Sequence, residues 1–489
     1  MLKLYNTLRG RKEVFEPLVS GIVRLYVCGV TVYDYCHVGH ARSALVFDVL
    51  RRYLEYTGLS VEFVKNFTDV DDKIIKRANE QGVSCDAVTA KYIAAYYEDM
   101  RRLGIRRAWR EPKATEHMAD IIALVETLVA KGLAYRVNGD VYFSVERYPD
   151  YGRLSKRKLA DLQAGARVEV DERKRHPMDF ALWKSSKPRE PWWESPWGPG
   201  RPGWHIECSA MSMKHLGATF DIHGGGMDLI FPHHENEMAQ SSGSTGQEFA
   251  RYWVHNGFVQ INQEKMSKSL GNFFTIREIF EKFEWPEEMT GEILRYFLLA
   301  THYRSPLDFS DQGLAEAKHA LDGFYDLFHR LDEVDGRKGP GDTSLRTVLE
   351  QTRVGFSRAM DDDLNTPMAL AEMQKLRNDV NKLVAEGLSV EDRQAARLEF
   401  RRLGDVLGLF QLDRWQFKPQ LKVNVGESLT ETDVSSALLA DREVQQRIDD
   451  RNEARRRRDF KKADEIRRQL AAQGITIEDR PDGTSRWKR

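Results

Sequence analysis

Residues 22–67 carry the pattern of a strand, a helix and a second strand, and this order limits the possible folds more than any other feature of the chain. IVRLYVCGV (22–30) is rich in β-branched and aromatic residues and ends at a glycine, which predicts a buried strand. Apolar residues at helical spacing over 41–58 predict a helix, and SVEFVKNF (60–67) predicts a second strand. Strands joined in this way are parallel, so we expect a ligand at their carboxyl ends.

The later parts of the chain predict a change from α/β to all-α structure. With 489 residues, the chain has the length of roughly three domains. WVHNGFVQI (253–261) is a further strand candidate, and the pattern after about residue 315 is helical almost throughout. From about residue 442, two charged helices precede a short strand and turn, which we interpret as a separate terminal module.

The composition predicts a protein that stays in the cytoplasm. No run of about eighteen apolar residues occurs, and the first residues lack the apolar core of a signal peptide. The four cysteines have no disulfide-framework spacing, and we expect Cys36 and Cys85 to be ordinary buried or half-buried thiols. We therefore expect a soluble protein with no membrane partner.

The formal net charge of −1 argues neither for nor against a polyanionic partner.

HVGH (37–40) stands between the first predicted strand and its helix. A helix N-terminus in this place offers free N–H groups and partial positive charge to phosphate. His37 and His40 are three residues apart, so both imidazoles would point the same way and could stabilise charge on a phosphoryl group. The alternative is a pair of surface histidines at a helix start. The sequence contains no Walker A motif, so any nucleotide site is of another kind.

KMSKSLGN (265–272) suits a loop that places Lys265 and Lys268 as point charges on a polyphosphate. The alternative is a solvated basic turn.

HHENE (233–237) has three interpretations: a metal site, an acid/base pair or a polar helix start. On a helix, His233 and Glu237 would project from one face. His234 and Glu235 would then be surface or supporting residues. Cys28, at the end of the first strand, and Cys208 would complete a tetrahedral zinc set with His233 and Glu237.

HVGH and KMSKS together resemble the HIGH and KMSKS signatures of the class I aminoacyl-tRNA synthetases, with Val38 in place of isoleucine. The resemblance implies that both motifs bind ATP and stabilise the attack of an amino acid carboxylate on the α-phosphate. Over essentially the entire chain, the motifs are similar in order to those of the cysteinyl-tRNA synthetase family. They are CGVTVYDYCHVGHAR, NFTDVDDKI, FALWK, GRPGWHIECSAM, HHENE, KMSKSLGN, RNEARRRRDFKKADEIR and GTSRW.

This resemblance implies a Rossmann-type parallel-sheet catalytic domain with an insertion, followed by a helical bundle and a small anticodon-binding module. The expected ranges are 1–110 and 200–262 for the catalytic domain, 111–199 for the insertion, 263–318 for the KMSKS loop and stem-contact region, 319–415 for the bundle, and 425–489 for the C-terminal module.

The resemblance also implies a cysteine–tRNA ligase. Such an enzyme uses ATP, with Mg²⁺ expected, to form cysteinyl-adenylate and pyrophosphate from L-cysteine, and then esterifies tRNA(Cys). In this family the positions matching Cys28, Cys208, His233 and Glu237 hold one zinc ion, which the substrate thiolate joins. Zinc prefers a thiol to the similarly shaped hydroxyl of serine, so a separate editing site is not needed.

Further positions have expected roles only through the resemblance. Contacts to cysteine are expected from Gly29, Thr31, Thr68, Trp204 and His223. Contacts to ATP or the adenylate are expected from Gly29, Thr31, His37, His40, Gly226, Asp228, Val259 and Lys268. For His223 and Asp228 taken alone, burial or helix capping is an equally good interpretation.

The basic run RNEARRRRDFKK (451–462) predicts a contact with the RNA backbone, and Phe460 or Trp487 could stack a base. A solvated charged helix is the alternative. Two other functions remain open: a ligase that joins cysteine to an amino sugar in mycothiol synthesis, and a catalytically silent RNA-binding paralogue. The basic tail argues against the first, and the intact motifs argue against the second. The sequence leaves the oligomeric state undecided, and a monomer is the family expectation.

Overall fold

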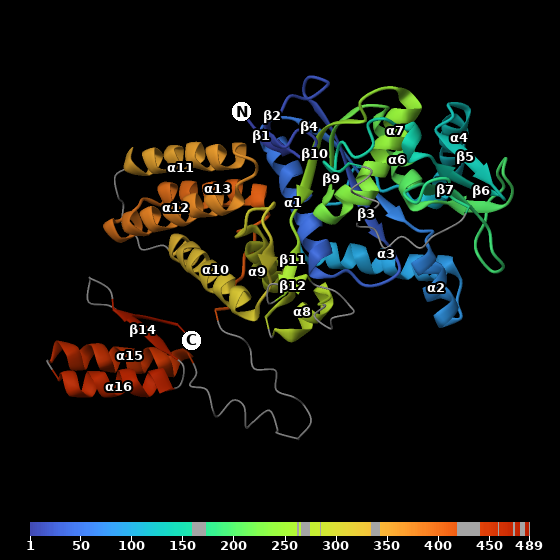
Figure 1. The fold of residues 1–489 in the computed structure, drawn as a ribbon. Helices are drawn as coiled ribbons and strands as arrows, with labels where there is room; N and C mark the ends of the chain where they lie inside the picture. The colour runs from blue at the N-terminus through green and yellow to red at the C-terminus, as the bar shows by residue number, and fades with distance from the viewer. Residues whose placement is uncertain are drawn as a thin grey trace. The chain divides into compact units, whose positions relative to one another are not determined.

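The structure is a computed structural model that describes most of the chain. The described residues are 1–158, 173–261, 264–265, 274–283, 285–333, 343–417, 441–457, 459–472, 475–479 and 485–488. The chain divides into two compact units (Figure 1). One contains Met1–Phe283 and Glu287–Asp413, and the other contains Glu284–Pro286 and Arg414–Arg489. Within the described part, no helix is both long enough and apolar enough to span a membrane.

The first unit is built around a parallel sheet with the strand order β10-β9-β3-β4. Its strands are β3 (Ile22–Thr31), β4 (Ser60–Thr68), β9 (Phe220–Gly226) and β10 (Ala250–Asn256). In Figure 1 the blue β3 and the green β9, far apart in the sequence, lie side by side. Helix α1 (Val38–Tyr56) connects β3 to β4, so the predicted strand–helix–strand unit with parallel pairing is confirmed.

Two neighbouring glycines of β9 allow close packing on both faces of the sheet. A Cβ atom on Gly224 would lie 2.2 Å from the Phe47 ring of α1. A Cβ atom on Gly225 would lie 2.8 Å from the ring of His234, which precedes helix α7 (Glu235–Thr245). Successive strand residues point to opposite faces. The glycines therefore let α1 and the HHENE segment pack on opposite sides of one strand.

The strand predicted over 253–261 is wrong as a single element. β10 ends at Asn256, and β11 (Val259–Ile261) joins a second sheet with β12 (Glu264–Lys265) and β13 (Leu307–Asp308). The break falls at Gly257, where a Cβ atom would lie 2.6 Å from the carbonyl oxygen of Ser305. The cause is a contact that is distant in the sequence, so the local apolar pattern does not reveal it.

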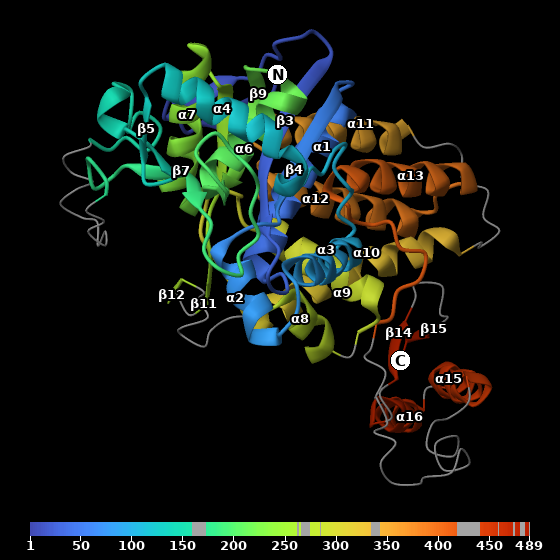
Figure 2. The ribbon, with the colours of Figure 1, turned by 90° about the vertical axis from the view of Figure 1, so that its right-hand side faces the viewer.

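An antiparallel sheet with the order β5-β6-β7-β8 occurs between β4 and β9 in the sequence. Its strands are β5 (Ala134–Val137), β6 (Asp140–Phe143), β7 (Phe180–Ser185) and β8 (Gly200–Pro202). Helices α2 (Asp72–Gln81), α3 (Cys85–Arg102) and α4 (Met118–Ala130) precede it. Helix α4 packs against α6 (Trp204–Leu216), which itself contacts β3 and β4 (Figure 2). The antiparallel sheet is thereby attached to the parallel one.

The rest of the first unit is mainly helical, as the pattern predicted. Its helices are α8 (Ile276–Lys282), α9 (Glu287–Leu299), α10 (Asp311–Asp332), α11 (Thr343–Asp361), α12 (Thr366–Glu386) and α13 (Val390–Leu407). The guanidinium of Arg42, on α1, donates hydrogen bonds to the carbonyl oxygens of Phe258 at 2.9 Å and Ser305 at 2.5 Å. This buried side chain joins α1, which begins with HVGH, to the segments beside β11 and β13.

The second unit contains two helices and a hairpin. They are α15 (Asp441–Arg456), α16 (Phe460–Ala472), β14 (Thr476–Asp479) and β15 (Ser485–Lys488). The small core consists of Val444, Ile448, Leu470, Ile475 and Ile477. The predicted helix pair is confirmed, and the predicted strand pairs with a second one. Phe460 is exposed, whereas the side chain of Trp487 lies outside the described residues.

Candidate active site and metal centre

Cys28 lies on β3 beside an irregularity in the sheet. The register of β3 against β4 shifts between Val27 and Val30, so Cys28 and Gly29 lie outside the regular pairing. A bulge of this kind changes the direction of a side chain. Cys28 is 8% exposed and helps to line a cavity at the carboxyl end of β3. This is the edge of the sheet at which a ligand was expected.

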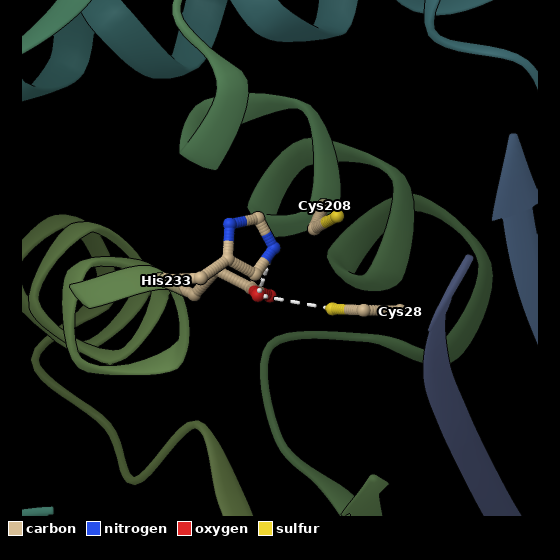
Figure 3. A group of neighbouring side chains, drawn as sticks. Cys28, Cys208 and His233 are labelled. Atoms are coloured by element: carbon tan, nitrogen blue, oxygen red, sulfur yellow. Dashed lines mark hydrogen bonds and ion pairs between the residues drawn. The ribbon is translucent and has the colours of Figure 1, made fainter. Parts of the chain in front are cut away.

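Three other residues reach the same point from separate elements. Cys208 projects from α6, His233 from the short turn η4 (Ile230–His234), and Glu237 from the first turn of α7. One donor atom from each of these residues and from Cys28 lies within 4.8 Å of the others, and all four side chains are buried. Figure 3 shows Cys28, Cys208 and His233 pointing toward one another. The structure thus brings together the four residues predicted as zinc ligands.

Glu237 is the centre of the hydrogen bonds in this cluster. Its Oε1 atom lies 2.9 Å from Nε2 of His233 and accepts the thiol proton of Cys28 at 3.1 Å. Its Oε2 atom lies 2.8 Å from Nε2 of His223, and His223 is completely buried. The prediction that His233 and Glu237 share one helix face is confirmed.

The electrostatics of the cluster favour the ionised donor form in Glu237 and Cys208, but not in Cys28. Burial opposes ionisation of Glu237, but His223 and His233 hold the pKa of its carboxyl well below the ordinary value. The neighbouring thiol of Cys28 lowers the pKa of Cys208 to about 6, whereas burial raises the pKa of Cys28 well above its ordinary value. Burial also opposes the charged form of His233, but Glu237 raises its pKa to about 10. A buried carboxylate and a thiolate are donor forms that a cation requires.

The donor chemistry of the predicted set fits zinc. Two thiols, one imidazole and one carboxylate are all zinc ligands, and zinc in proteins is usually held by four ligands in a tetrahedron. The set also borders the cavity at the carboxyl end of β3. Trp204 lines this cavity, and the centroid of its ring lies 4.2 Å from that of the His233 ring.

A second group of donors, Cys28, His223, His234 and Glu237, is also compact enough to hold a cation. Its two histidines are completely buried, and neither belongs to the described wall of the cavity. His234 is held by His255, whose Nε2 lies 2.8 Å from Nδ1 of His234. A metal in this second position would have one thiol ligand, whereas the set with Cys208 offers two. We therefore favour the set with Cys208 and His233.

The cavity at the end of β3 has a volume of about 410 Å³. The predicted residues on its wall are Cys28, Gly29, Thr31, His37, His40, Trp204, Gly226, Asp228 and Val259. A larger hollow of about 960 Å³ lies beside α11 and contains none of the predicted site residues that the structure describes.

HVGH forms the first turn of α1, where His37 is the N-cap. Nδ1 of His37 accepts the N–H of Gly39 at 3.0 Å, and Nδ1 of His40 accepts the N–H of His37 at 3.2 Å. The two rings stack with their centroids 3.7 Å apart, so the prediction that they point the same way is confirmed. The rings and the helix N-terminus together face the cavity.

Two predicted contacts to cysteine lie away from the cavity wall. Thr68 is buried at the end of β4. The expectation that His223 lines the pocket differs from the structure, because Glu237 lies on one side of its ring and Trp253 stacks on it at 4.5 Å. His223 supports the site through Glu237 instead.

The other residues of HHENE are also buried, so a surface position for them is wrong. His234 bonds to His255 as described above. Glu235 accepts the backbone N–H groups of Gly152 at 2.9 Å and Ser155 at 2.7 Å. These bonds connect the start of α7 to the backbone of residues 152–155.

The KMSKS lysines are only partly covered by the structure. The backbone of Lys265 pairs with Gln260 in the sheet of β11 and β12. The side chain of Lys265 and all of Lys268 lie outside the described residues.

Two residues that support the site were not predicted from the sequence. Nδ1 of His205 lies 2.8 Å from Nδ1 of His233, and Oδ1 of Asn66 accepts the N–H of Gly29 at 2.8 Å. His205 precedes Cys208 by three residues, and this helical spacing could have identified it. Asn66 carries no comparable signal, because its role depends on pairing between β3 and β4.

Comparisons with known proteins agree with this geometry. Residues 14–319 match the family model described as tRNA synthetases class I (C) catalytic domain, and residues 355–411 match the DALR domain. The chain is 53% identical to cysteine–tRNA ligase of Geobacter sulfurreducens, over 100% of this chain and 99% of that protein. The corresponding protein of Geobacter metallireducens is 52% identical over the same shares.

Solved structures of more distant proteins share the fold. The methionyl-tRNA synthetase of Mycobacterium tuberculosis in complex with methionyl-adenylate has a TM-score of 0.57 at 17% identity, over 79% of this chain and 93% of its own. The LeuRS–tRNA–LeuAMS complex of Agrobacterium radiobacter has a TM-score of 0.58 at 13% identity, over 89% and 94%. A class I synthetase fold accounts for both likenesses.

Proposed function

The chain belongs to the cysteine–tRNA ligases, a family of class I aminoacyl-tRNA synthetases, and from this premise we propose which of its residues select cysteine and activate it. As a member of that family it binds ATP, L-cysteine and tRNA, and it joins cysteine to tRNA(Cys). The mycothiol alternative is not favoured, because the relatives named cysteine–tRNA ligase match over the full chain, including its C-terminal end.

We propose that Cys28, Cys208, His233 and Glu237 hold one zinc ion. The convergence of these four side chains from four elements beside the cavity is the observation that carries the proposal. Zinc bound there would supply a Lewis acid that prefers a thiolate to a hydroxyl. Trp204 lines the cavity and contacts the ring of His233. His223 and His205 orient the ligands Glu237 and His233.

The remaining residues of the wall are assigned to the other parts of the substrates. Gly29, Thr31 and Thr68 are proposed to contact the amino and carboxylate groups of cysteine. The ribose of ATP is assigned to Gly226 and Asp228, whose carboxylate can accept hydrogen bonds from both hydroxyls. The backbone of Val259 is assigned to adenine. The position of these residues around one cavity supports the assignment, except for Thr68.

The phosphates are assigned to the N-terminus of α1. His37 and His40 donate hydrogen bonds through Nε2 in this proposal, because the Nδ1 atom of each ring accepts a backbone N–H. Lys265 and Lys268 are also assigned to the phosphates, with Mg²⁺. Donors fixed before the reaction stabilise the charge that develops on the α-phosphate without further rearrangement.

The ranges given above are proposed as the catalytic domain, insertion, stem-contact region, bundle and anticodon-binding module. The protein is proposed to be a cytoplasmic monomer. In the terminal module, the exposed Phe460 and the basic residues of α15 and α16 are the candidates for RNA contacts.

The zinc proposal is tested with Cys208→Ser. This variant should lose bound zinc and affinity for cysteine together, while the KM for ATP stays near that of the unchanged protein. Retention of both zinc and cysteine affinity would overturn the assignment of Cys208.

A further inference from the structure

We propose that Asn66 is a positioning residue that sets the two thiols of the metal centre and donates a hydrogen bond to the sulfur of Cys208. The inference rests on the proposed zinc site and adds a residue on a fifth element, β4. Asn66 is 1% exposed and lies next to the irregular part of β3.

Asn66 fixes the backbone beside Cys28. Its Oδ1 atom accepts the N–H of Gly29 at 2.8 Å, at the point where regular pairing between β3 and β4 is interrupted. The strands also approach very closely here, since a Cβ atom on Gly29 would lie 1.5 Å from the backbone oxygen of Asn66. Glycine at 29 and the side-chain acceptor at 66 together hold the bulge. The bulge in turn sets the direction of the Cys28 thiol.

The same amide contacts the second thiol. Sγ of Cys208 lies 3.7 Å from Oδ1 of Asn66, a distance at which the thiol proton is donated to the amide oxygen. The other end of the amide, Nδ2, is buried and has no hydrogen-bond partner among the residues that the structure describes. A buried N–H group without a partner is costly, and such groups usually have a purpose.

Metal binding changes the Cys208 sulfur from a hydrogen-bond donor to an acceptor. A cysteine ligand has lost its proton, so its sulfur can accept a hydrogen bond and can no longer donate one. The unpaired Nδ2 of Asn66 belongs to the same small group that already contacts this sulfur. In the metal-bound state, Nδ2–H is the proposed donor to the thiolate, and Oδ1 is still the acceptor of the N–H of Gly29. A carboxamide is the side chain that supplies both an acceptor and a neutral donor here.

The test compares zinc affinity, measured by competition with a chromophoric chelator, in the full-length protein. Asn66→Leu has a similar shape but removes both bonds, and Asn66→Ser shortens the side chain without adding charge. Phe63→Ala is the matched control: Phe63 is a buried residue three positions earlier on β4, so its side chain points to the other face. This control loosens the same strand without touching the amide.

We expect both Asn66 variants to bind zinc about 10- to 100-fold more weakly, as is typical when a residue that supports a metal ligand is lost. Phe63→Ala should retain the affinity of the unchanged protein. Cobalt substitution adds a readout, since the thiolate-to-metal charge-transfer band should shift in the Asn66 variants and not in the control.

Unchanged zinc affinity and an unchanged cobalt spectrum in a folded Asn66 variant would overturn the inference. An equal loss of affinity in Phe63→Ala would also overturn it, because the effect would then be general loosening of the strand. If Asn66→Leu does not fold, Asn66→Ser decides the question by the same criteria. If the unchanged protein binds no zinc, the proposed metal centre itself fails and this inference fails with it. A zinc-binding protein whose Asn66 variants bind equally well contradicts only the role of Asn66.

Discussion

Nε2 of His223 lies 2.8 Å from Oε2 of Glu237, and neither side chain is exposed to solvent. This bond occupies one oxygen of the carboxylate and leaves Oε1 toward Cys28 and His233. His223 therefore fixes the orientation of a proposed zinc ligand without facing the cavity. Residues in this position usually affect metal affinity strongly.

Replacing His223 with Phe should weaken zinc binding by about 10- to 100-fold. The ring can still stack on Trp253, but the bond to Glu237 is lost. The KM for cysteine should rise with the loss of zinc, while the KM for ATP should not. His215→Phe is a suitable control, because His215 contacts His117 and lies outside the cluster. If the two variants bind zinc with equal affinity, His223 does not support the metal centre.

His37→Asn separates helix capping from catalysis. Asparagine is among the best N-cap residues, so the variant should keep the helix start, whereas His37→Ala should lose about 1 kcal/mol of stability. Both variants lack the imidazole that faces the cavity, and both should lower cysteine-dependent pyrophosphate exchange by about 100- to 1,000-fold. Thermal melting and exchange rates check the two effects. Near-normal exchange in His37→Asn would mean that capping is the only role of His37.

Glu292→Gln should change how stability depends on pH. Burial raises the pKa of Glu292 to about 7, although the N–H of Phe410 and the hydroxyl of Tyr325 donate to its carboxylate. An acid with a raised pKa favours the folded state below its unfolded value of 4.5, and this contribution is lost as pH rises through about 7. A rise from 4.5 to about 7 corresponds to about 3 kcal/mol.

The variant should therefore show a smaller fall in melting temperature between about pH 5 and pH 8 than the unchanged protein. If the melting temperatures of the two proteins fall equally between pH 5 and pH 8, Glu292 has an ordinary pKa.

Ending the chain after Asp413 should spare adenylate formation and weaken tRNA charging. All predicted site residues that the structure describes belong to the first unit, and the second unit has a core of its own. Cysteine-dependent pyrophosphate exchange should stay near normal, while the KM for tRNA should rise by about tenfold or more, or at least 1.4 kcal/mol of binding free energy. Equal loss of both activities would indicate a structural role for the terminal module.

The sequence predicted the elements with strong local patterns. The unit of β3, α1 and β4 and the charged helix pair each show a clear periodicity, and the structure contains them. HHENE could be interpreted only with Cys28 and Cys208, because His233 and Glu237 alone resemble any polar helix start. Their convergence depends on a fold that brings β3, α6 and α7 together.

What the sequence did not predict depends on distant contacts. The break at Gly257 comes from Ser305, and the support that Asn66 gives to Gly29 comes from the register of two strands. The burial of Glu235 depends on backbone groups near residue 152. No local pattern contains these partners, so propensity and spacing could not identify them.

We propose that a zinc ion held by Cys28, Cys208, His233 and Glu237 distinguishes cysteine from serine. The most direct measurement is amino-acid-dependent pyrophosphate exchange with each of the two amino acids, before and after the metal is removed and restored. We expect kcat/KM for cysteine to be at least about ten-thousandfold above that for serine, and we expect the exchange with cysteine to be lost without zinc. Undiminished cysteine-dependent exchange in the zinc-free protein, or comparable exchange with serine, would contradict this proposal.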